Sequence, residues 1–579
     1  MRASRNSAGA ALLAALLLAG SAALAQIGAP VPLSPSPGGA APYPPPPGYP
    51  PPPGSGYTPP APPSSGITVD QLAPPSPEAA GVIDLTTHGF PATLWQGSNR
   101  TTVLALLPKI GSTTSPALQD LAYRLLASTA SPPGGAGEGS LLGLRAERLT
   151  NALGRADTAL ALLQSLPPAQ RGEDLGKVSV DLAFLSDDHN SACGQIRDRD
   201  HGWQSPYWTY GQITCQALDG DGTGAQLGLD MMREQKLKDD GFAALALRVM
   251  GSDAKLSEAL PSPQPMALAL LEKANLAVPK KAFDSARLPV LVAVANGAGF
   301  PAEQRVAAAE KAAVYGAIVP DALAAAYLAT PLDEDDQENP LNRADAAGGA
   351  KGRAILFRAA HDATAFPAKA NFLQSLLLKA PRDIYPAVIR AAQPMLLELP
   401  ASPEAKPLAA DFARALFALD HPNEARQWLD LADPAQAATV LPLAHIAGGA
   451  AAPGWSNTPL TDLAGGSSKK DAALAQKRAT ALVQLLAAEG APVPDSLVVP
   501  LLDAKVGGPG SVGPGLLIES ESSAKHLGGT VLAVLAALGD DGAGGPSQTV
   551  AQSVAALRRI GLPDDARRLA IDAALAAGF

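Results

Sequence analysis

Apolar residues recur at intervals of three and four along most of the chain beyond residue 80. The spacing is clearest over residues 116–129, 140–153, 157–166, 241–250, 263–276, 302–318, 410–419, 477–489 and 553–562. It places apolar side chains on one face of an α-helix. The Ala, Leu, Arg and Glu residues that fill these stretches are strong helix formers. Alternating strand patterns are nearly absent, so the sequence predicts an all-α fold.

The breaks between several predicted helices share one form. An apolar helix end is followed by Gly or Asp, and an Ala comes five residues later. The form occurs at Gly154 with Ala159, Gly220 with Ala225, Asp420 with Ala425, and Gly561 with Ala566. Gly or Asp lets the chain leave the first helix. The Ala allows the second helix to pack closely against the first.

These four stretches resemble the turn between the two helices of a tetratricopeptide-like repeat. The turns are separated by intervals near, but not on, multiples of that family's period of about 34 residues. The family's Trp-x2-Leu-Gly-x2-Tyr pattern does not occur. The resemblance implies an irregular helical-hairpin solenoid, and proteins built from stacked helix pairs commonly bind other proteins.

The N-terminus has the layout of a secretory signal peptide over residues 1–25. Arg2 and Arg5 precede an apolar run, and an Ala-x-Ala sequence ends at Ala25, which predicts cleavage before Gln26. The high Ala, Gly, Pro and Arg content suggests a bacterial source, so we expect export to the periplasm. Thirteen prolines between residues 41 and 63 predict a disordered, polyproline-like linker over residues 26–80.

The remaining chain is expected to fold as two helical halves. Residues 331–352 are acidic, rich in Gly and without helical periodicity, and we predict a linker there. The N-terminal solenoid half would then span residues 81–330 and the C-terminal half residues 353–579. About 500 residues exceed one compact core, which favours more than one unit.

Charge and motifs exclude several function classes. The formal net charge is −10 and no basic cluster occurs, so nucleic acid is not an expected partner. No run beyond the leader reaches the roughly 18 apolar residues of a membrane span. We predict no catalytic residue, metal or cofactor. The alternative is an envelope enzyme, or an accessory of one, acting on peptidoglycan. Glu519-Ser520 and Glu521-Ser522 resemble the Glu-Ser catalytic signature of lytic transglycosylases, but nothing after them resembles the rest of that domain.

One segment, residues 187–221, carries both cysteines of the chain. An oxidising compartment favours pairing of two nearby thiols, so we predict a Cys193–Cys215 disulfide across two antiparallel helices. The first helix is expected over residues 177–196 and the second from Pro206. Zinc held by His189, Cys193, His201 and Cys215 is one alternative, and two free buried thiols are another.

The same segment has the densest group of aromatic residues. Trp203, Tyr207, Trp208 and Tyr210 lie within eight residues of a chain with 25 aromatics. Helical spacing turns Trp208 inward with Cys215. Trp203, Tyr207 and Tyr210 are predicted to bind a partner, with local core packing as the alternative. The sequence therefore predicts a secreted, non-catalytic helical scaffold or adaptor for an envelope protein or peptide.

Overall fold

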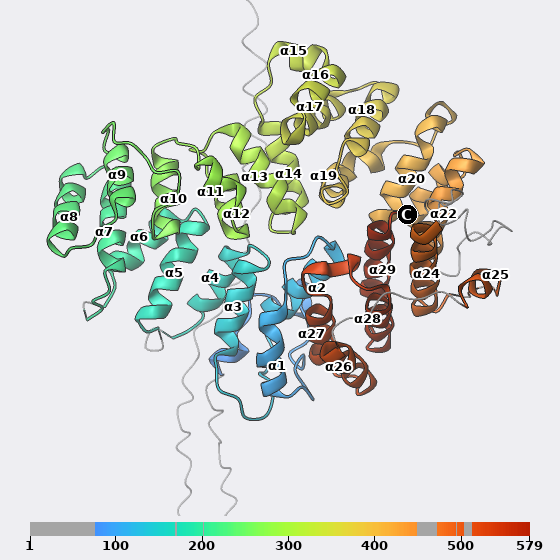
Figure 1. Cartoon of the computed structure of the whole chain (residues 1–579), viewed down its shortest axis with the longest axis horizontal. Helices are drawn as coiled ribbons and strands as arrows, with labels where there is room; N and C mark the ends of the chain where they lie inside the picture. Colours follow the sequence, from blue (N-terminus) through green and yellow to red (C-terminus); the bar gives the residue numbers. More distant parts are fainter. Residues whose placement is uncertain are drawn as a thin grey trace, which may run out of the picture. The chain divides into compact units, whose positions relative to one another are not determined.

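The computed structural model describes residues 76–167, 171–200, 202–448, 472–491, 493, 495–502 and 512–579. Residues 73–579 form one compact unit. Its described residues are mostly helical, which confirms the all-α prediction, and they form only isolated β-bridges (Figure 1). The predicted signal peptide, the Ala25–Gln26 cleavage site and the linker as far as residue 75 lie outside the described residues.

The helices follow one another with short connections. The first group is α1 (Arg100–Leu106), α2 (Pro116–Ala127), α3 (Leu141–Asn151), α4 (Ala156–Gln164), α5 (Glu173–Leu185), α6 (His189–Arg197), α7 (Tyr207–Leu218), α8 (Gly222–Glu234), α9 (Asp240–Val249) and α10 (Gln264–Lys273). The second is α11 (Lys280–Asp284), α12 (Leu288–Asn296), α13 (Ala302–Val314), α14 (Pro320–Ala329), α15 (Glu334–Glu338), α16 (Pro340–Ala347), α17 (Gly349–Asp362), α18 (Phe366–Leu378) and α19 (Tyr385–Glu398). The third is α20 (Ala409–Ala418), α21 (Pro422–Leu429), α22 (Pro434–Gly448), α24 (Ala472–Ala488), α25 (Asp495–Val498), α26 (Val512–Ser523), α27 (Leu527–Leu538), the 3₁₀ helix η8 (Gly539–Gly544), α28 (Ser547–Arg559) and α29 (Pro563–Ala577). None of the helices in these described ranges is both long and apolar enough to cross a bilayer.

All four predicted turns join a pair of contacting helices. The Gly or Asp that follows the first helix has a positive φ in each case: 65° at Gly154, 79° at Gly220, 60° at Asp420 and 88° at Gly561. The Ala five residues later is fully buried in each case. The pairs are α3–α4, α7–α8, α20–α21 and α28–α29. Left-handed backbone and a small side chain at the crossing explain why this spacing recurs.

A fifth turn of this form divides the helix that was predicted over residues 177–196. Asp187 has φ 61°, and Ala192, five residues later, is fully buried. The chain leaves α5 at Ser186, and Asp188 then caps α6 by accepting a hydrogen bond from the Ser191 amide at 3.0 Å. The apolar spacing runs through this turn unbroken, which is why periodicity alone predicts a single helix.

Residues 331–352 contain α15, α16 and the start of α17 where the sequence predicts a linker. Their acidic residues have structural roles. Asp333 forms a capping box with Asp336, and Asp336 pairs with Arg343 at 2.8 Å and with Lys351 at 3.7 Å. Helix α14 packs on α17 and α19, so the helices on either side of this segment share one core.

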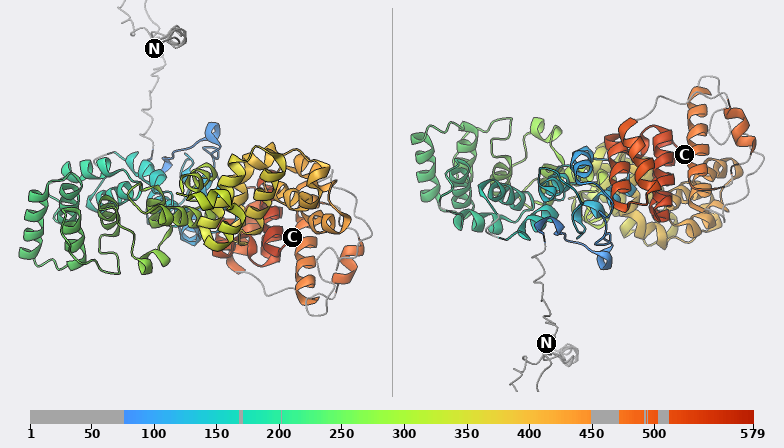
Figure 2. Two further views of the ribbon diagram at one scale, coloured as in Figure 1. Left: turned by 90° about the horizontal axis from the view of Figure 1, so that it is seen from above. Right: turned by 90° about the horizontal axis from the view of Figure 1, so that it is seen from below.

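The first described helices lie beside the last ones. Helix α2 contacts α27 and α29, and α1 contacts α27; the blue and red ribbons lie side by side in Figures 1 and 2. In a linear solenoid each repeat contacts only its neighbours. The α2–α29 contact instead joins parts of the unit that are more than 400 residues apart in sequence, so the unit departs from a linear solenoid.

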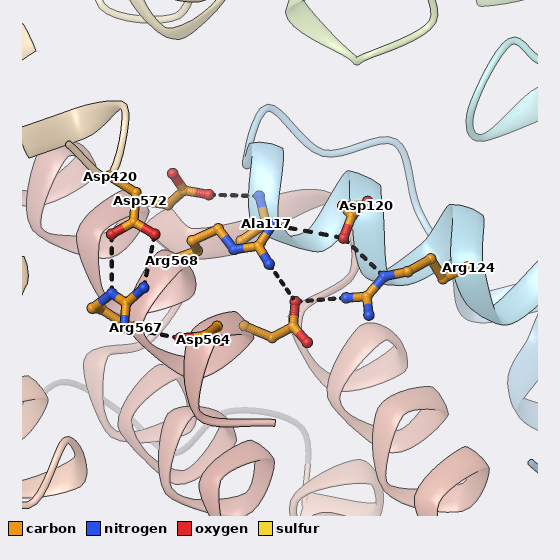
Figure 3. Close-up of polar contacts among 9 residues, drawn as sticks. Ala117, Asp120, Arg124, Asp420, Asp564, Arg567, Arg568 and Asp572 are labelled. Atoms are coloured by element: carbon orange, nitrogen blue, oxygen red, sulfur yellow. Dashed lines mark hydrogen bonds and ion pairs between the residues drawn. The ribbon is translucent and has the colours of Figure 1, made fainter. Parts of the chain in front are cut away.

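Charged side chains line this contact between α2 and α29 (Figure 3). Arg124 pairs with Asp565 at 2.5 Å and with Asp120 at 2.8 Å. Arg568 reaches Asp565 at 3.3 Å. Arg567 extends the network to the α20–α21 turn by pairing with Asp420 at 2.9 Å. We call these six residues the α2–α29 seam.

The folded unit begins before residue 80, where the sequence predicts the end of the linker. Arg145 is fully buried and donates to the carbonyl oxygens of Ala80 at 2.7 Å, Leu126 at 2.7 Å and Ser128 at 2.8 Å. Glu78 pairs with Arg100 at 2.5 Å. Because a buried guanidinium needs partners for its donors, these carbonyls fix residues 78–80 on the helical body.

Candidate functional site

The disulfide joins α6 to α7. Cys193 and Cys215 are bonded with their Cα atoms 5.6 Å apart, which confirms the predicted pairing. Both are buried, and Cys215 shares the inner face of α7 with Trp208. The sulfur atoms are therefore not metal ligands, and His201, the remaining partner in the zinc alternative, lies outside the described residues.

Trp208 is the buried centre of the aromatic group. Its indole Nε1 donates to a Glu173 carboxylate oxygen at 2.9 Å. Trp203 stacks on it with ring centroids 5.1 Å apart, and Tyr207 meets it edge-on at 5.2 Å. Glu173 also accepts from the Ser205 amide. The hydrogen bonds to Glu173 therefore hold the start of α7 against α5.

Tyr207 and Tyr210 are half-buried and also contact their own chain. The Tyr207 hydroxyl donates to Asp181 at 2.7 Å, and Tyr210 packs edge-on against Phe242 at 4.8 Å. Burial raises the pKa of Asp181 to about 6. Their predicted role in partner binding, with Trp203, remains a prediction.

A separate cavity of about 380 Å³ lies where α2, α19, α20, η8 and α29 meet. The chain segments that build it are far apart in sequence. Its lining consists of Thr114, Ser115, Pro116, Ala380, Arg382, Asp383, Tyr385, Pro386, Arg414, Ala543, Gly544, Asp572, Leu575, Ala576, Gly578 and Phe579. This volume is in the range of small-molecule or peptide side-chain sites. We refer to it as the interhelical cavity.

Asp572 is one of two acidic residues, with Asp383, that line the interhelical cavity, and it lies beside the α2–α29 seam. One carboxylate oxygen accepts from the Ser115 hydroxyl at 2.5 Å and from the Ala117 amide at 2.9 Å; the second contact is drawn in Figure 3. The carboxylate thus caps the N-terminus of α2 from another helix. Burial raises the pKa of Asp572 to about 6, against the opposing effect of these two hydrogen bonds.

Three arginines lie in the lining of the interhelical cavity or contact its lining residues. Arg382 and Arg414 line it. Arg478 donates to the Gly578 carbonyl and stacks over the Phe579 ring at 4.7 Å. Burial, together with the positive charges of Arg382 and Arg414, lowers the pKa of Arg478. The positive charge of Arg478 is therefore repelled by those of Arg382 and Arg414.

Only one of these arginines has a carboxylate partner among the described residues. Arg414 lies 3.5 Å from Asp411 and donates to the Thr439 hydroxyl at 2.8 Å. Arg382 is exposed and Arg478 is half-buried, and neither forms an ion pair with a described residue. The Arg478 Nε is a buried donor that has no hydrogen-bond partner among the described residues. These three arginines can therefore bind a negatively charged group at the interhelical cavity.

Several of the other residues that line the interhelical cavity are apolar. Phe579 is buried, and Pro116, Pro386 and Leu575 also face the cavity. Burial raises the pKa of Tyr385, so its hydroxyl stays protonated and can donate a hydrogen bond. The arrangement suits a ligand that combines a carboxylate with an apolar group.

Sequence reasoning did not find the interhelical cavity. Arg382, Arg414 and Arg478 are isolated residues in separate predicted helices or loops, and no local motif connects them. The one available signal is that Arg382-Asp383 follows a Pro in a break between helices, a position that exposes both side chains. Their convergence depends on contacts of α20 with α19 and α29, and of α24, which carries Arg478, with α29.

The residues considered for peptidoglycan hydrolysis are engaged in other contacts. Glu519 pairs with Arg559 at 3.0 Å, and Glu521 pairs with His526 at 3.0 Å. The two carboxylates thus serve contacts of α26 with α28 and α27.

None of the protein families, curated proteins or solved structures with which the chain was compared matches it.

Proposed function

We propose that the protein is a non-catalytic helical scaffold that binds an acidic segment of an envelope protein or peptide in the interhelical cavity. The observation that carries the proposal is the group of Arg382, Arg414 and Arg478 beside apolar walls. Arginine recognises carboxylates through a planar fork of donors. Phe579 and Leu575 offer surface to the side chains that flank the acidic group.

A rigid frame supports binding without large rearrangement. The walls come from four long helices, and the α2–α29 seam holds two of them together. Preorganised sites lose less entropy on binding than mobile ones. The successive helix pairs support an irregular solenoid scaffold. Export to the periplasm is predicted from the leader sequence and is compatible with the disulfide. It would present the cavity to envelope proteins.

The charge preference can be measured with the purified chain and a pool of short peptides of equal length. We expect the protein to retain acidic peptides and to release basic ones, with affinity falling as salt rises because surface charges are screened. Arg382→Glu should abolish the acidic preference. Because the Arg382 side chain is exposed, we expect this variant to stay folded.

Arg287→Glu supplies the matched control. Arg287 is also exposed and lies at the start of α12, outside the cavity lining. Arg287→Glu therefore changes the net charge by the same amount as Arg382→Glu without changing the cavity. Equal loss of acidic-peptide binding in both variants would show that the net charge of the protein, and not the cavity, determines the preference. Retention of acidic peptides by Arg382→Glu would contradict the proposed site.

A further inference from the structure

A second cluster of chemical groups lies near the disulfide, away from the interhelical cavity. It consists of Asp187 in the α5–α6 turn, His189 at the start of α6 and Glu272 near the end of α10. One donor atom from each residue lies within 4.8 Å of the other two. The three residues come from two parts of the chain that are more than 80 residues apart.

The imidazole lies farther from each carboxylate than in an ordinary hydrogen bond, whereas the Asp187 and Glu272 carboxyl groups interact directly with each other. His189 Nε2 lies 3.6 Å from an Asp187 carboxylate oxygen and 3.9 Å from Glu272 Oε2. Three atoms with such separations share a central point roughly 2.1–2.4 Å from each of them. Nitrogen and oxygen ligands bind Zn²⁺ at about 2.0–2.2 Å, so shifts of a few tenths of an ångström would complete the coordination.

The local packing directs these donors toward one another. The Gly299 amide donates to Glu272 Oε1 at 3.4 Å, which leaves Oε2 toward His189. A Cβ at Gly299 would lie 2.2 Å from the Glu272 carbonyl oxygen, so only Gly permits this approach. The Phe184 ring packs on the imidazole with centroids 5.8 Å apart. Such outer contacts orient metal ligands in known sites.

The charge of the cluster is not balanced by direct ion pairs. Neither Asp187 nor Glu272 forms an ion pair with a described Lys or Arg, and their only such partner is His189. Asp188 does not join the cluster because its carboxylate caps α6. Asp187 and His189 line a cavity of about 330 Å³ that Lys273 and Arg197 also line, and these two positive charges oppose cation binding. The same cavity gives solvent molecules access to open coordination positions.

We propose that Asp187, His189 and Glu272 form a binding site for a divalent transition-metal ion, with Zn²⁺ as the best-matched ion. One imidazole and two carboxylates suit Zn²⁺, whereas Ca²⁺ and Mg²⁺ prefer oxygen ligands alone. Three protein ligands leave at least one position for water. The site retains His189 from the sequence-based zinc hypothesis but replaces both cysteines with carboxylates from elsewhere in the chain.

The test uses the full chain with its disulfide intact, stripped with EDTA and then titrated with ZnCl₂ by isothermal titration calorimetry. We expect one saturable ion per chain and a rise in melting temperature with Zn²⁺. His189→Gln and Glu272→Gln should each weaken binding by about tenfold or more and remove the rise in melting temperature.

His361→Gln is the matched control. His361 lies 2.7 Å from Asp362 on an exposed helix end, so it is another histidine beside a carboxylate, but no third donor from the described part of the chain joins that pair. This variant should bind Zn²⁺ like the wild type. Circular dichroism and thiol labelling establish that each variant is folded and disulfide-bonded. The wild-type titration tests the proposal even if a variant does not fold. Absence of saturable binding in the wild type, or binding that survives both His189→Gln and Glu272→Gln, would overturn the proposal.

Discussion

At the residue scale, Glu310 holds three helices together through one buried carboxylate. It accepts from the Tyr327 hydroxyl at 2.6 Å and pairs with Arg353 through both carboxylate oxygens. All three residues are buried and come from α13, α14 and α17. Arg353 follows the segment that the sequence predicts as a linker, so this triad ties together the two predicted halves.

Removing Arg353 should be costly because it leaves the Glu310 charge buried without its cation. We expect Arg353→Met to lower the free energy of unfolding by about 3 kcal/mol or more. Tyr327→Phe should lower it by about 1 kcal/mol, since only one hydrogen bond is lost. Urea denaturation of the purified protein measures both values.

The control for this prediction is the pair Lys280–Asp284, whose side chains are 88% and 54% exposed. Lys280→Met should change the free energy of unfolding by less than about 0.5 kcal/mol, because exposed pairs contribute little. Similar losses for Lys280→Met and Arg353→Met would contradict the assigned role of the triad.

Asp572 predicts a specific pH dependence. Burial raises its pKa to about 6, so the folded state binds the proton more tightly than the unfolded state does. Its contribution to the free energy of unfolding is therefore present at low pH and falls as the pH rises from about 4 to about 6. Relative to Asp572→Asn, the wild type should lose on the order of 2 kcal/mol over this interval.

Denaturation at a series of pH values tests this prediction. Asp181 also has its pKa raised to about 6 by burial, but it titrates in both proteins and cancels in the comparison. A wild-type-minus-variant difference that stays constant with pH would show that Asp572 does not titrate in this range.

At the element scale, the disulfide stabilises the α6–α7 pair. It closes a loop across a sequence separation of 22 residues. In the chain-entropy model, such a cross-link contributes about 3 kcal/mol by restricting the unfolded chain. We expect the Cys193→Ala, Cys215→Ala double variant to lose about that much free energy of unfolding.

Denaturation with and without reductant provides the measurement. The wild type should fall to the stability of the double variant when it is reduced, whereas the variant should be insensitive to reductant. Two reactive thiols in the mature, unreduced, denatured protein would contradict the assigned bond.

The local elements could be predicted from the sequence because they depend on near neighbours. Gly154, Gly220 and Gly561 combine left-handed backbone with a buried Ala five residues later, and both signals can be read within six residues. The Asp187 turn was missed because apolar spacing continues across it. The acidic segment 331–352 was misjudged because its carboxylates serve as caps and ion-pair partners.

At the scale of the whole molecule, the α2–α29 seam joins helices that are distant in sequence. The Arg124–Asp565 pair is 13% and 6% exposed at its two side chains. We expect a double-mutant cycle with Arg124→Ala and Asp565→Ala to give a coupling energy of about 1–3 kcal/mol. The exposed pair Arg233–Asp230 should give less than about 0.5 kcal/mol.

Equilibrium denaturation of the two single variants and the double variant supplies each cycle. A coupling for Arg124–Asp565 no larger than that for Arg233–Asp230 would show that this ion pair does not hold the two helices together.

The long-range arrangement could not be predicted from one sequence. The seam and the interhelical cavity depend on pairing α2 with α29, and neither helix carries a local signal for its partner. The same limit applies to Glu272, which approaches His189 only after α10 packs against α5 and α7.

The most direct test of the proposed scaffold is site-specific photo-crosslinking in intact cells. A photoreactive amino acid replaces Ala576, an exposed residue of the interhelical cavity lining, and in a control replaces Ala325, an exposed residue of α14 outside it. The account predicts a discrete partner adduct at residue 576 that is absent at residue 325, lost with Arg382→Glu and kept with Arg287→Glu. Equal adducts at both positions, or an adduct at residue 576 that persists with Arg382→Glu, would contradict it.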